Sequence, residues 1–126
     1  MFGVEPELAA DARESLQRGA IVHWDGELTG RTMADGLRNQ ALGALPFEHL
    51  RRYLSGIVTV TEKQIADAVR TLAARARLVA EPSGAVATAA HLCGAAPQPD
   101  GDDARVLIIS GGNIDPARFR EILAGD

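Results

Sequence analysis

The chain has 126 residues, of which 46% are hydrophobic and 24% are charged, and its formal net charge is −4. This size and composition indicate one soluble globular domain with a moderate core. The negative charge argues against a nucleic-acid partner, and a single cysteine excludes an internal disulfide and a thiolate metal site. No stretch has the pattern of a signal peptide or the length of a membrane span, so we expect a cytoplasmic protein that does not bind a membrane.

The first half of the chain predicts a strand, then helices separated by loops. Residues 2–6 read as a short strand, and Pro6 opens a helix over 7–18 that Gly19 ends. Residues 21–24 are expected to be extended, 25–31 form a turn-rich loop, and a helical turn follows near Asp35 and Gly36. A further helix is predicted over 46–54.

The second half predicts a strand at 57–60 and three more helices. Thr61 and Gln64 match a capping box, and the amphipathic helix that follows is expected to run to about residue 78. Pro82 opens a helix of small residues that reaches about residue 92. An exposed acidic linker covers 97–103, and the last helix spans 116–124, with Asp115 as its N-cap.

A short apolar run, residues 106–109, precedes this last helix. It lacks alternation, which favours a strand buried on both faces. Ser110, Gly111 and Gly112 follow it, and adjacent glycines allow a close approach of the backbone to a ligand. A strand, a glycine turn and a helix start form the usual ligand-binding edge of an α/β protein. A tight turn that merely requires glycine is the competing interpretation.

Acidic residues crowd the start of the chain. Glu5 and Asp11, with the backbone between them, could chelate a hard cation through oxygen atoms. A simpler interpretation is that carboxylates near a helix N-terminus interact favourably with the helix dipole.

The order of these elements predicts an α/β fold with a partial, mainly parallel sheet flanked by helices. Three strands form a thin sheet with uncovered edges, so residues 1–126 are expected to be one partial domain rather than a complete one.

Five landmarks in this order resemble those of fold-type II pyridoxal-phosphate enzymes, the threonine/serine dehydratase and serine racemase family, whose fold is like that of the tryptophan synthase β chain. The landmarks are the runs Gly-Val-Glu-Pro at 3–6, Ala-Asp-Gly at 34–36, Ile-Val-Thr-Val-Thr at 57–61, Glu-Pro-Ser-Gly-Ala at 81–85 and Ser-Gly-Gly-Asn-Ile-Asp at 110–115. The match covers only the C-terminal part of that family's catalytic domain.

The resemblance implies roles for individual residues. The family's cofactor ring nitrogen accepts a hydrogen bond from a serine that corresponds to Ser110, with Gly111 and Glu81 beside the cofactor. The other implied roles are a substrate pocket at Asp35 and Gly36, a site for Mg²⁺ or a similar cation at Glu5, Ala9 and Asp11, and a possible nucleotide-effector site at Asn113 and Arg77.

The resemblance also implies that essential parts are absent. The only lysine, Lys63, lies in a capped helix and matches no Schiff-base motif, and no glycine-rich phosphate loop is present. We therefore expect no catalytic residue in this chain, which reads as a segment of a threonine/serine ammonia-lyase that is inactive alone and needs an N-terminal half or a homologous subunit. Three alternatives are a serine racemase segment, a non-catalytic interaction protein that pairs with a homologue, and a small module that binds a phosphorylated ligand at Gly111 and Gly112.

Overall fold

A computed structural model describes residues 1–125. Its sheet has two parallel strands, β1 (Phe2–Pro6) and β2 (Gly56–Val60), which pair in register from Phe2 opposite Gly56 to Pro6 opposite Val60. The helices α1 (Asp11–Arg18), α2 (Gly26–Thr29), η1 (Asp35–Leu37, a 3₁₀ turn) and α3 (Ala44–Tyr53) connect the strands. Three helices follow β2, namely α4 (Glu62–Thr71, continued as the π-helical turn η2, Leu72–Ala76), α5 (Pro82–Leu92) and α6 (Pro116–Ala124).

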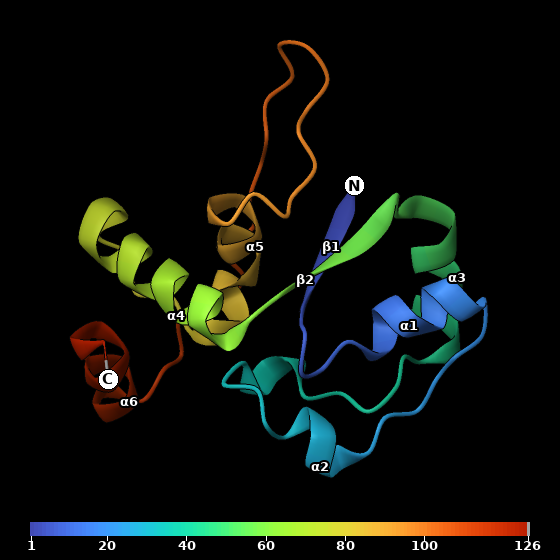
Figure 1. Ribbon diagram of the computed structural model, residues 1–126, viewed down its shortest axis with the longest axis horizontal. Coiled ribbons are helices and arrows are strands. Elements are labelled where there is room, and N and C mark those ends of the chain that lie inside the picture. The colour runs from blue at the N-terminus through green and yellow to red at the C-terminus, as the bar shows by residue number, and fades with distance from the viewer. Residues whose placement is uncertain (126) are drawn as a thin grey trace.

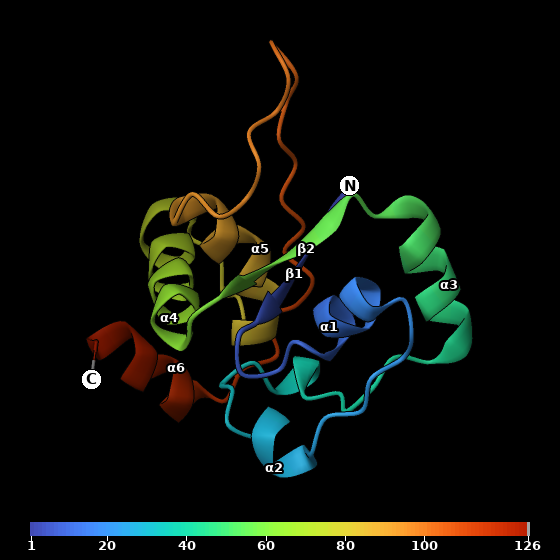
Figure 2. The same cartoon turned by 45° about the vertical axis from the view of Figure 1, so that its right-hand side comes forward.

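The two strands lie between two groups of helices. Helices α1 and α3 lie on one side of the strands, and α4, α5 and α6 lie on the other (Figures 1 and 2). This arrangement confirms the predicted α/β class with a small parallel sheet flanked by helices. None of the helices in residues 1–125 is both long enough and apolar enough to cross a membrane.

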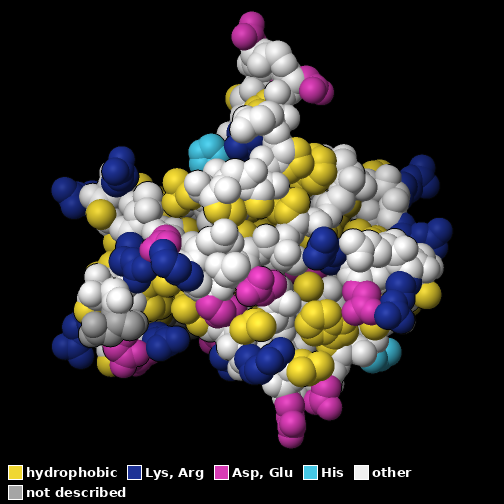
Figure 3. Space-filling model, in the orientation of Figure 1, with side chains coloured by type: hydrophobic (Ala, Val, Ile, Leu, Met, Phe, Trp, Pro, Cys, Tyr) yellow, Lys and Arg dark blue, Asp and Glu magenta, His cyan; other side chains and the backbone are white. Residues whose placement is uncertain are grey.

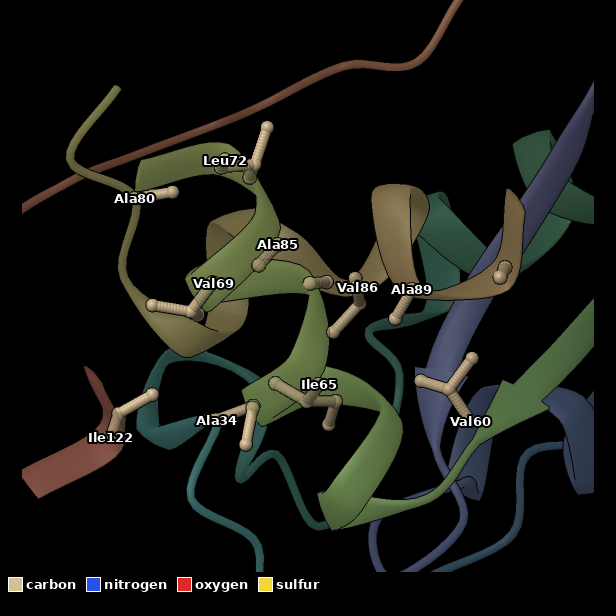
Figure 4. Packing of buried hydrophobic residues seen from close by; sticks show 13 residues of the cluster. Ala34, Val60, Ile65, Val69, Leu72, Ala80, Ala85, Val86, Ala89 and Ile122 are labelled. Carbon is tan, nitrogen blue, oxygen red and sulfur yellow. The ribbon is translucent and has the colours of Figure 1, made fainter. Parts of the chain in front are cut away.

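The core is concentrated between α4 and α5. Ile65 and Val69 of α4 face Ala85, Val86 and Ala89 of α5, and all five side chains are buried (Figure 4). Small alanine side chains let the two helices approach closely, and the core between them consists of aliphatic contacts.

The predicted starts of α4, α5 and α6 are confirmed, because local capping residues and prolines define them. Thr61 accepts from Gln64 N, and the Gln64 side chain accepts from Thr61 N at 2.8 Å, which completes the capping box of α4. Asp115 accepts from the backbone N–H groups of Ala117 and Arg118 at the start of α6. Both α5 and α6 begin at the prolines named above.

Helix α1 begins later than predicted, at Asp11 rather than at residue 7. The carboxylate of Glu5 accepts from the N–H groups of Ala12 and Arg13 at 3.1 and 2.8 Å, and Glu7 N donates to Val60 O at 2.9 Å. The chain after Pro6 is therefore held by the strands, and a tertiary cap from β1 sets the first turn of α1.

Three other predicted elements differ from the structure. Residues 21–24 form no strand, and the loop over 25–31 contains the short helix α2, which the Asp25 side chain caps. The helix predicted to reach residue 78 ends its α-helical part at Thr71, and Arg77 takes a left-handed conformation with φ 58° after the π-helical turn.

The predicted strand over 106–109 is wrong. Within residues 1–125 this run has no strand partner, and Val106 and Ile108 are 82% and 74% exposed. Strand structure requires a paired neighbour, and β1 pairs only with β2 in this part of the chain. The run therefore lies on the surface instead of between two layers.

Candidate functional site

Tightly packed glycines hold the chain that follows residues 106–109 against the start of α5. Glu81 N donates to Gly111 O at 3.1 Å. A Cβ atom on Gly84 would lie 2.8 Å from Gly111 N and would overlap Gly111 O, and a Cβ on Gly111 would overlap the Glu81 carboxylate. Gly84 cannot carry a side chain because its Cβ would meet backbone atoms, whereas a Cβ at Gly111 would require the flexible Glu81 side chain to move. The backbone of Gly111 therefore lies against the start of α5 beside Glu81.

The 3₁₀ turn η1 is attached to the same end of α5. Gly36 N donates to Ser83 Oγ at 2.9 Å and to Asp35 Oδ1 at 3.0 Å. A Cβ on Gly36 would lie 3.1 Å from that same Ser83 oxygen, so this glycine also allows a close approach. This contact brings Asp35 and Gly36 to the same end of α5 as Glu81, which is far from them in the sequence.

A cavity of about 300 Å³ opens at this place. Three of the site residues implied by the resemblance line it, namely Asp35, Glu81 and Asn113. Its remaining lining residues are Met33, Arg38, Pro82, Ile114, Asp115 and Arg118. The walls therefore offer carboxylates, guanidinium groups and an amide, which are groups that bind a small zwitterion.

Sequence reasoning missed the two arginines of this cavity. Arg38 donates through Nε and Nη2 to Thr32 O at 3.0 and 2.7 Å, and Arg118 Nη1 donates to Glu121 at 3.1 Å. Neither arginine belongs to a recognisable motif. The only available signal was that each lies within three residues of a residue already singled out, Asp35 or Asp115.

Other predicted residues lie outside this cavity. Ser110 is exposed, and its hydroxyl makes no hydrogen bond within residues 1–125, although the next residue touches Glu81. Arg77 is exposed at the end of the π-helical turn and is not among the lining residues, so the structure does not bring it into one pocket with Asn113.

Lys63 lies on the outside of α4. Its side chain is 82% exposed and forms an ion pair with Asp67 at 2.8 Å. This exposed lysine is paired with the neighbouring turn of its own helix and is not among the residues that line the cavity at the start of α5.

Of the predicted cation ligands, Glu5 lies on β1, Ala9 lies in the turn that follows, and Asp11 is the first residue of α1. Ala9 is fully buried, Asp11 is 3% exposed, and Asp11 Oδ2 is buried without a hydrogen-bond partner in the described part of the chain. The carbonyl of Ala9 accepts none of the backbone hydrogen bonds outside the helices and strands. A buried carboxylate oxygen without a hydrogen-bond partner is a group that a bound cation would stabilise.

Burial also affects the ionisation of the Glu5 and Asp11 carboxyl groups. Desolvation raises the pKa of Glu5 from 4.5 to about 7, against the lowering effect of the Arg13 and Ala12 N–H groups, and the nearby Asp11 charge raises it further. Desolvation also raises the pKa of Asp11. The described residues contain no cluster of three or more His, Cys, Asp or Glu side chains that could hold a metal. The predicted set therefore rests on two carboxylates and one carbonyl.

Comparison with known proteins identifies the family of the chain. Residues 1–111 match the family model described as pyridoxal-phosphate dependent enzyme. The chain is 36% identical over 98% of its length to a serine racemase of Schizosaccharomyces pombe, and 38% identical over 91% of its length to an L-threonine ammonia-lyase of Thermotoga maritima. It spans 37% of the first of these relatives and 27% of the second.

Solved structures give the same result. The T.th. threonine deaminase superposes with a TM-score of 0.82 at 42% identity, covering 90% of this chain and 39% of that one. Maize serine racemase superposes with a TM-score of 0.82 at 28% identity, covering 98% of this chain and 39% of that one. These matches confirm the resemblance inferred from the five landmarks: the chain belongs to the pyridoxal-phosphate dependent enzyme family and spans less than two-fifths of the length of these relatives.

Proposed function

We propose that the chain is the C-terminal segment of a pyridoxal-phosphate-dependent threonine/serine ammonia-lyase, which converts a hydroxy amino acid to a 2-oxo acid and ammonia. The observation that carries this proposal is the meeting of three landmark segments, 34–36, 81–85 and 110–115, at one end of α5. The similarity to threonine ammonia-lyases supports the substrate class.

The residues present fit one side of a cofactor site. Pyridoxal phosphate, when bound, supplies an electron sink that stabilises negative charge at the substrate α-carbon. Within residues 1–125, Ser110 has an unpaired, exposed hydroxyl that can hydrogen-bond the ring nitrogen, and the contact of Gly111 with Glu81 and Gly84 fixes the backbone from which it projects. A neutral hydroxyl does not require a protonated ring nitrogen, which suits elimination over a long-lived carbanion.

The cavity beside η1 is proposed to bind the substrate. Asp35 and Gly36 are the proposed substrate contacts, and Arg38 and Arg118 can balance a substrate carboxylate. Glu81, in the same wall, is the proposed neighbour of the cofactor. Asn113 lines the same cavity and is the proposed contact for a nucleotide effector, whereas Arg77, the other residue of that prediction, lies outside the cavity. The lysine that anchors the cofactor and the loop that binds its phosphate would come from outside this chain.

We also propose that Glu5, Ala9 and Asp11 hold a divalent cation. The unpartnered buried oxygen of Asp11 and the raised pKa of Glu5 support this assignment, since a cation would relieve both. The cation would fix the junction of β1 and α1, and it is therefore proposed to be structural or activating rather than catalytic. We further propose a cytoplasmic location.

A chimera tests the proposed activity. The chain replaces its matched segment in the T.th. threonine deaminase, and folding is checked by circular dichroism and by the visible absorbance of the cofactor. We expect release of a 2-oxo acid from threonine, a loss of roughly 10-fold or more in kcat for Ser110→Ala, and no change for Lys63→Ala. A folded, cofactor-loaded chimera without this release would contradict the proposal.

The same chimera separates the alternative function. A serine racemase segment, favoured by the similarity to the Schizosaccharomyces pombe and maize proteins, would instead convert L-serine to D-serine faster than it eliminates water. The chain alone is expected to release no 2-oxobutyrate from threonine and to give no new visible absorbance with pyridoxal phosphate, because Lys63 is outside the site.

A further inference from the structure

One carboxylate attaches the segment that carries Asp35 to the helix that follows β2. Glu62, the first residue of α4, accepts a hydrogen bond through Oε2 from Met33 N at 2.6 Å, although the two residues are 29 positions apart. Met33 and Asp35 both line the cavity at the start of α5. The Glu62 carboxylate therefore holds one end of the wall in which Asp35 lies.

The start of α4 does not require this carboxylate. Thr61 and Gln64 complete the capping box by themselves, since the side chain of each accepts from the backbone N–H of the other. A carboxylate in the first turn also interacts favourably with the helix dipole, but water could solvate it there. Neither effect explains why Glu62 binds Met33, so the reason for this contact lies outside the helix.

The second oxygen of Glu62 shows that the contact is made under constraint. Oε1 is buried and has no hydrogen-bond partner within residues 1–125. On the face in Figure 3, charged side chains lie at the surface, where water can solvate them. A buried carboxylate oxygen without a partner destabilises a fold, so the bond from Met33 to Oε2 is kept although it lowers stability.

The segment 32–38 is closed by its own hydrogen bonds. Arg38 donates through Nε and Nη2 to Thr32 O at 3.0 and 2.7 Å, and Ala34 N donates to Thr32 Oγ1 at 3.1 Å. Ala34 is also fully buried in the core. Because the segment is internally closed, an anchor at one of its residues constrains the others.

Asp35 lies between two such anchors. On one side Met33 N donates to Glu62, and on the other Gly36 N donates to Ser83 Oγ at 2.9 Å. The first anchor comes from α4 and the second from α5. The two side chains together fix the place of Asp35 relative to the packed pair of helices.

We infer that Glu62 is a positioning residue of the proposed substrate pocket. By accepting from Met33 N, it holds Asp35 and Gly36 where they contact the amino acid. The inference rests on the proposed function, which assigns Asp35 and Gly36 to the substrate. Glu62 is not among the residues that line the cavity, so it acts through Met33 and does not touch the substrate.

Variants of the threonine deaminase chimera test this role. Glu62→Ala removes the acceptor, and Glu62→Asp keeps the charge but shortens the side chain by one methylene. Both should raise KM for threonine by about 10-fold and change kcat by less than about threefold, because a hydrogen bond to a charged group that holds a binding contact is lost. Glu62→Gln keeps an acceptor for Met33 N and should hold KM within about threefold of the wild type.

The matched control is Glu27→Ala, which removes an exposed carboxylate from the first turn of α2. It should leave KM and kcat unchanged. Backbone hydrogen exchange adds a readout that does not depend on turnover. In Glu62→Ala and Glu62→Asp the peptide containing 32–38 should exchange about 10-fold faster than in the wild type, whereas Glu62→Gln and Glu27→Ala should not change it.

Several results would overturn the inference. Wild-type KM and exchange in Glu62→Asp, or a Glu62→Gln variant as impaired as Glu62→Ala, would show that the charge matters and the bond to Met33 does not. Faster exchange without a rise in KM, in an active chimera, would separate the anchor from substrate binding. Unfolding of both Glu62→Ala and Glu62→Asp would assign Glu62 to stability alone. A folded, cofactor-loaded chimera that releases no 2-oxo acid would refute the proposed function, and the exchange rates would still decide whether Glu62 anchors 32–38.

Discussion

The carboxylates of Glu5 and Asp11 predict that the stability of the fold depends on pH and on divalent cations. Burial raises the pKa of Glu5 from 4.5 to about 7, and it raises the pKa of Asp11 as well. A pKa that is higher in the folded state means that the folded state holds the proton more tightly. This stabilisation is complete below pH 4.5 and is lost as the pH rises through about 7.

The size of the effect follows from the shift of Glu5. The difference between about 7 and 4.5 corresponds to an upper bound of roughly 3 kcal/mol at about 1.36 kcal/mol per pKa unit. Glu5 is only half-buried and keeps two N–H donors, so solvent screening reduces the expected loss to about 1–2 kcal/mol. For a chain of this size, the melting temperature should fall by roughly 3–8 °C between pH 4.5 and about pH 7.5 when a chelator is present.

A divalent cation should reverse this loss, because it binds the deprotonated carboxylates. With a Kd of about 1 mM, about 10 mM Mg²⁺ would add roughly 1.4 kcal/mol to the free energy of unfolding. Thermal or urea unfolding followed by circular dichroism, at both pH values and with either EDTA or magnesium, measures both terms. The magnesium increment should be present at about pH 7.5 and absent at pH 4.5, where Glu5 is protonated.

The Asp11→Ala variant distinguishes two interpretations of Asp11, a ligand of a bound cation and a buried charge that only destabilises the fold. Removing the unpartnered Oδ2 should leave stability in EDTA unchanged or raise it by up to about 1 kcal/mol. The magnesium increment should disappear. Glu7→Ala, an exposed carboxylate on the same turn, should keep the increment. An equal increment in Asp11→Ala and the wild type, or a wild type whose stability does not change with pH or magnesium, would refute this reasoning.

Three further predictions concern packing and local order. Gly84→Ala should destabilise the fold by about 1–3 kcal/mol in urea unfolding, although alanine is the better helix former by about 1 kcal/mol, because its Cβ would overlap Gly111 O; Gly43→Ala, where space exists, should be nearly neutral. Thr61→Ala should cost about 1 kcal/mol by removing the capping box of α4, measured in the same way, and a loss below a few tenths would contradict this role. Arg105→Ala should speed proteolysis within residues 97–104 without changing the melting temperature, and cleavage at the wild-type rate would show that this side chain does not hold the loop.

The parts of the fold that the sequence predicts well are those whose cause is local. Asp115 and the proline after it define the start of α6, and Thr61 with Gln64 defines the start of α4, because each cap is made by side chains within three residues. The start of α1 was predicted four residues too early, because its cap comes from Glu5 on the preceding strand. Side-chain capping across elements has no signature in the local pattern.

The strand predicted over 106–109 failed for a different reason. An apolar run indicates that a segment will be buried, but it does not indicate which chain buries it. Here β1 and β2 pair with each other, and the run 106–109 has no strand partner within residues 1–125. The error is therefore informative, because it identifies an apolar segment that residues 1–125 do not cover.

Ser110 is exposed and does not line the cavity, whereas the next residue, Gly111, packs against the start of α5. Gly111 lies against Glu81 and Gly84, and this contact fixes the end of the segment that carries Ser110. The backbone of Gly111 contacts the start of α5, and the predicted contact of this glycine with a cofactor stays a prediction. A cofactor at Ser110 would use a hydroxyl that is exposed, and the lysine that anchors it would have to come from outside this chain, because Lys63 is exposed on α4 and paired with Asp67. The chain alone is therefore not expected to bind the cofactor productively.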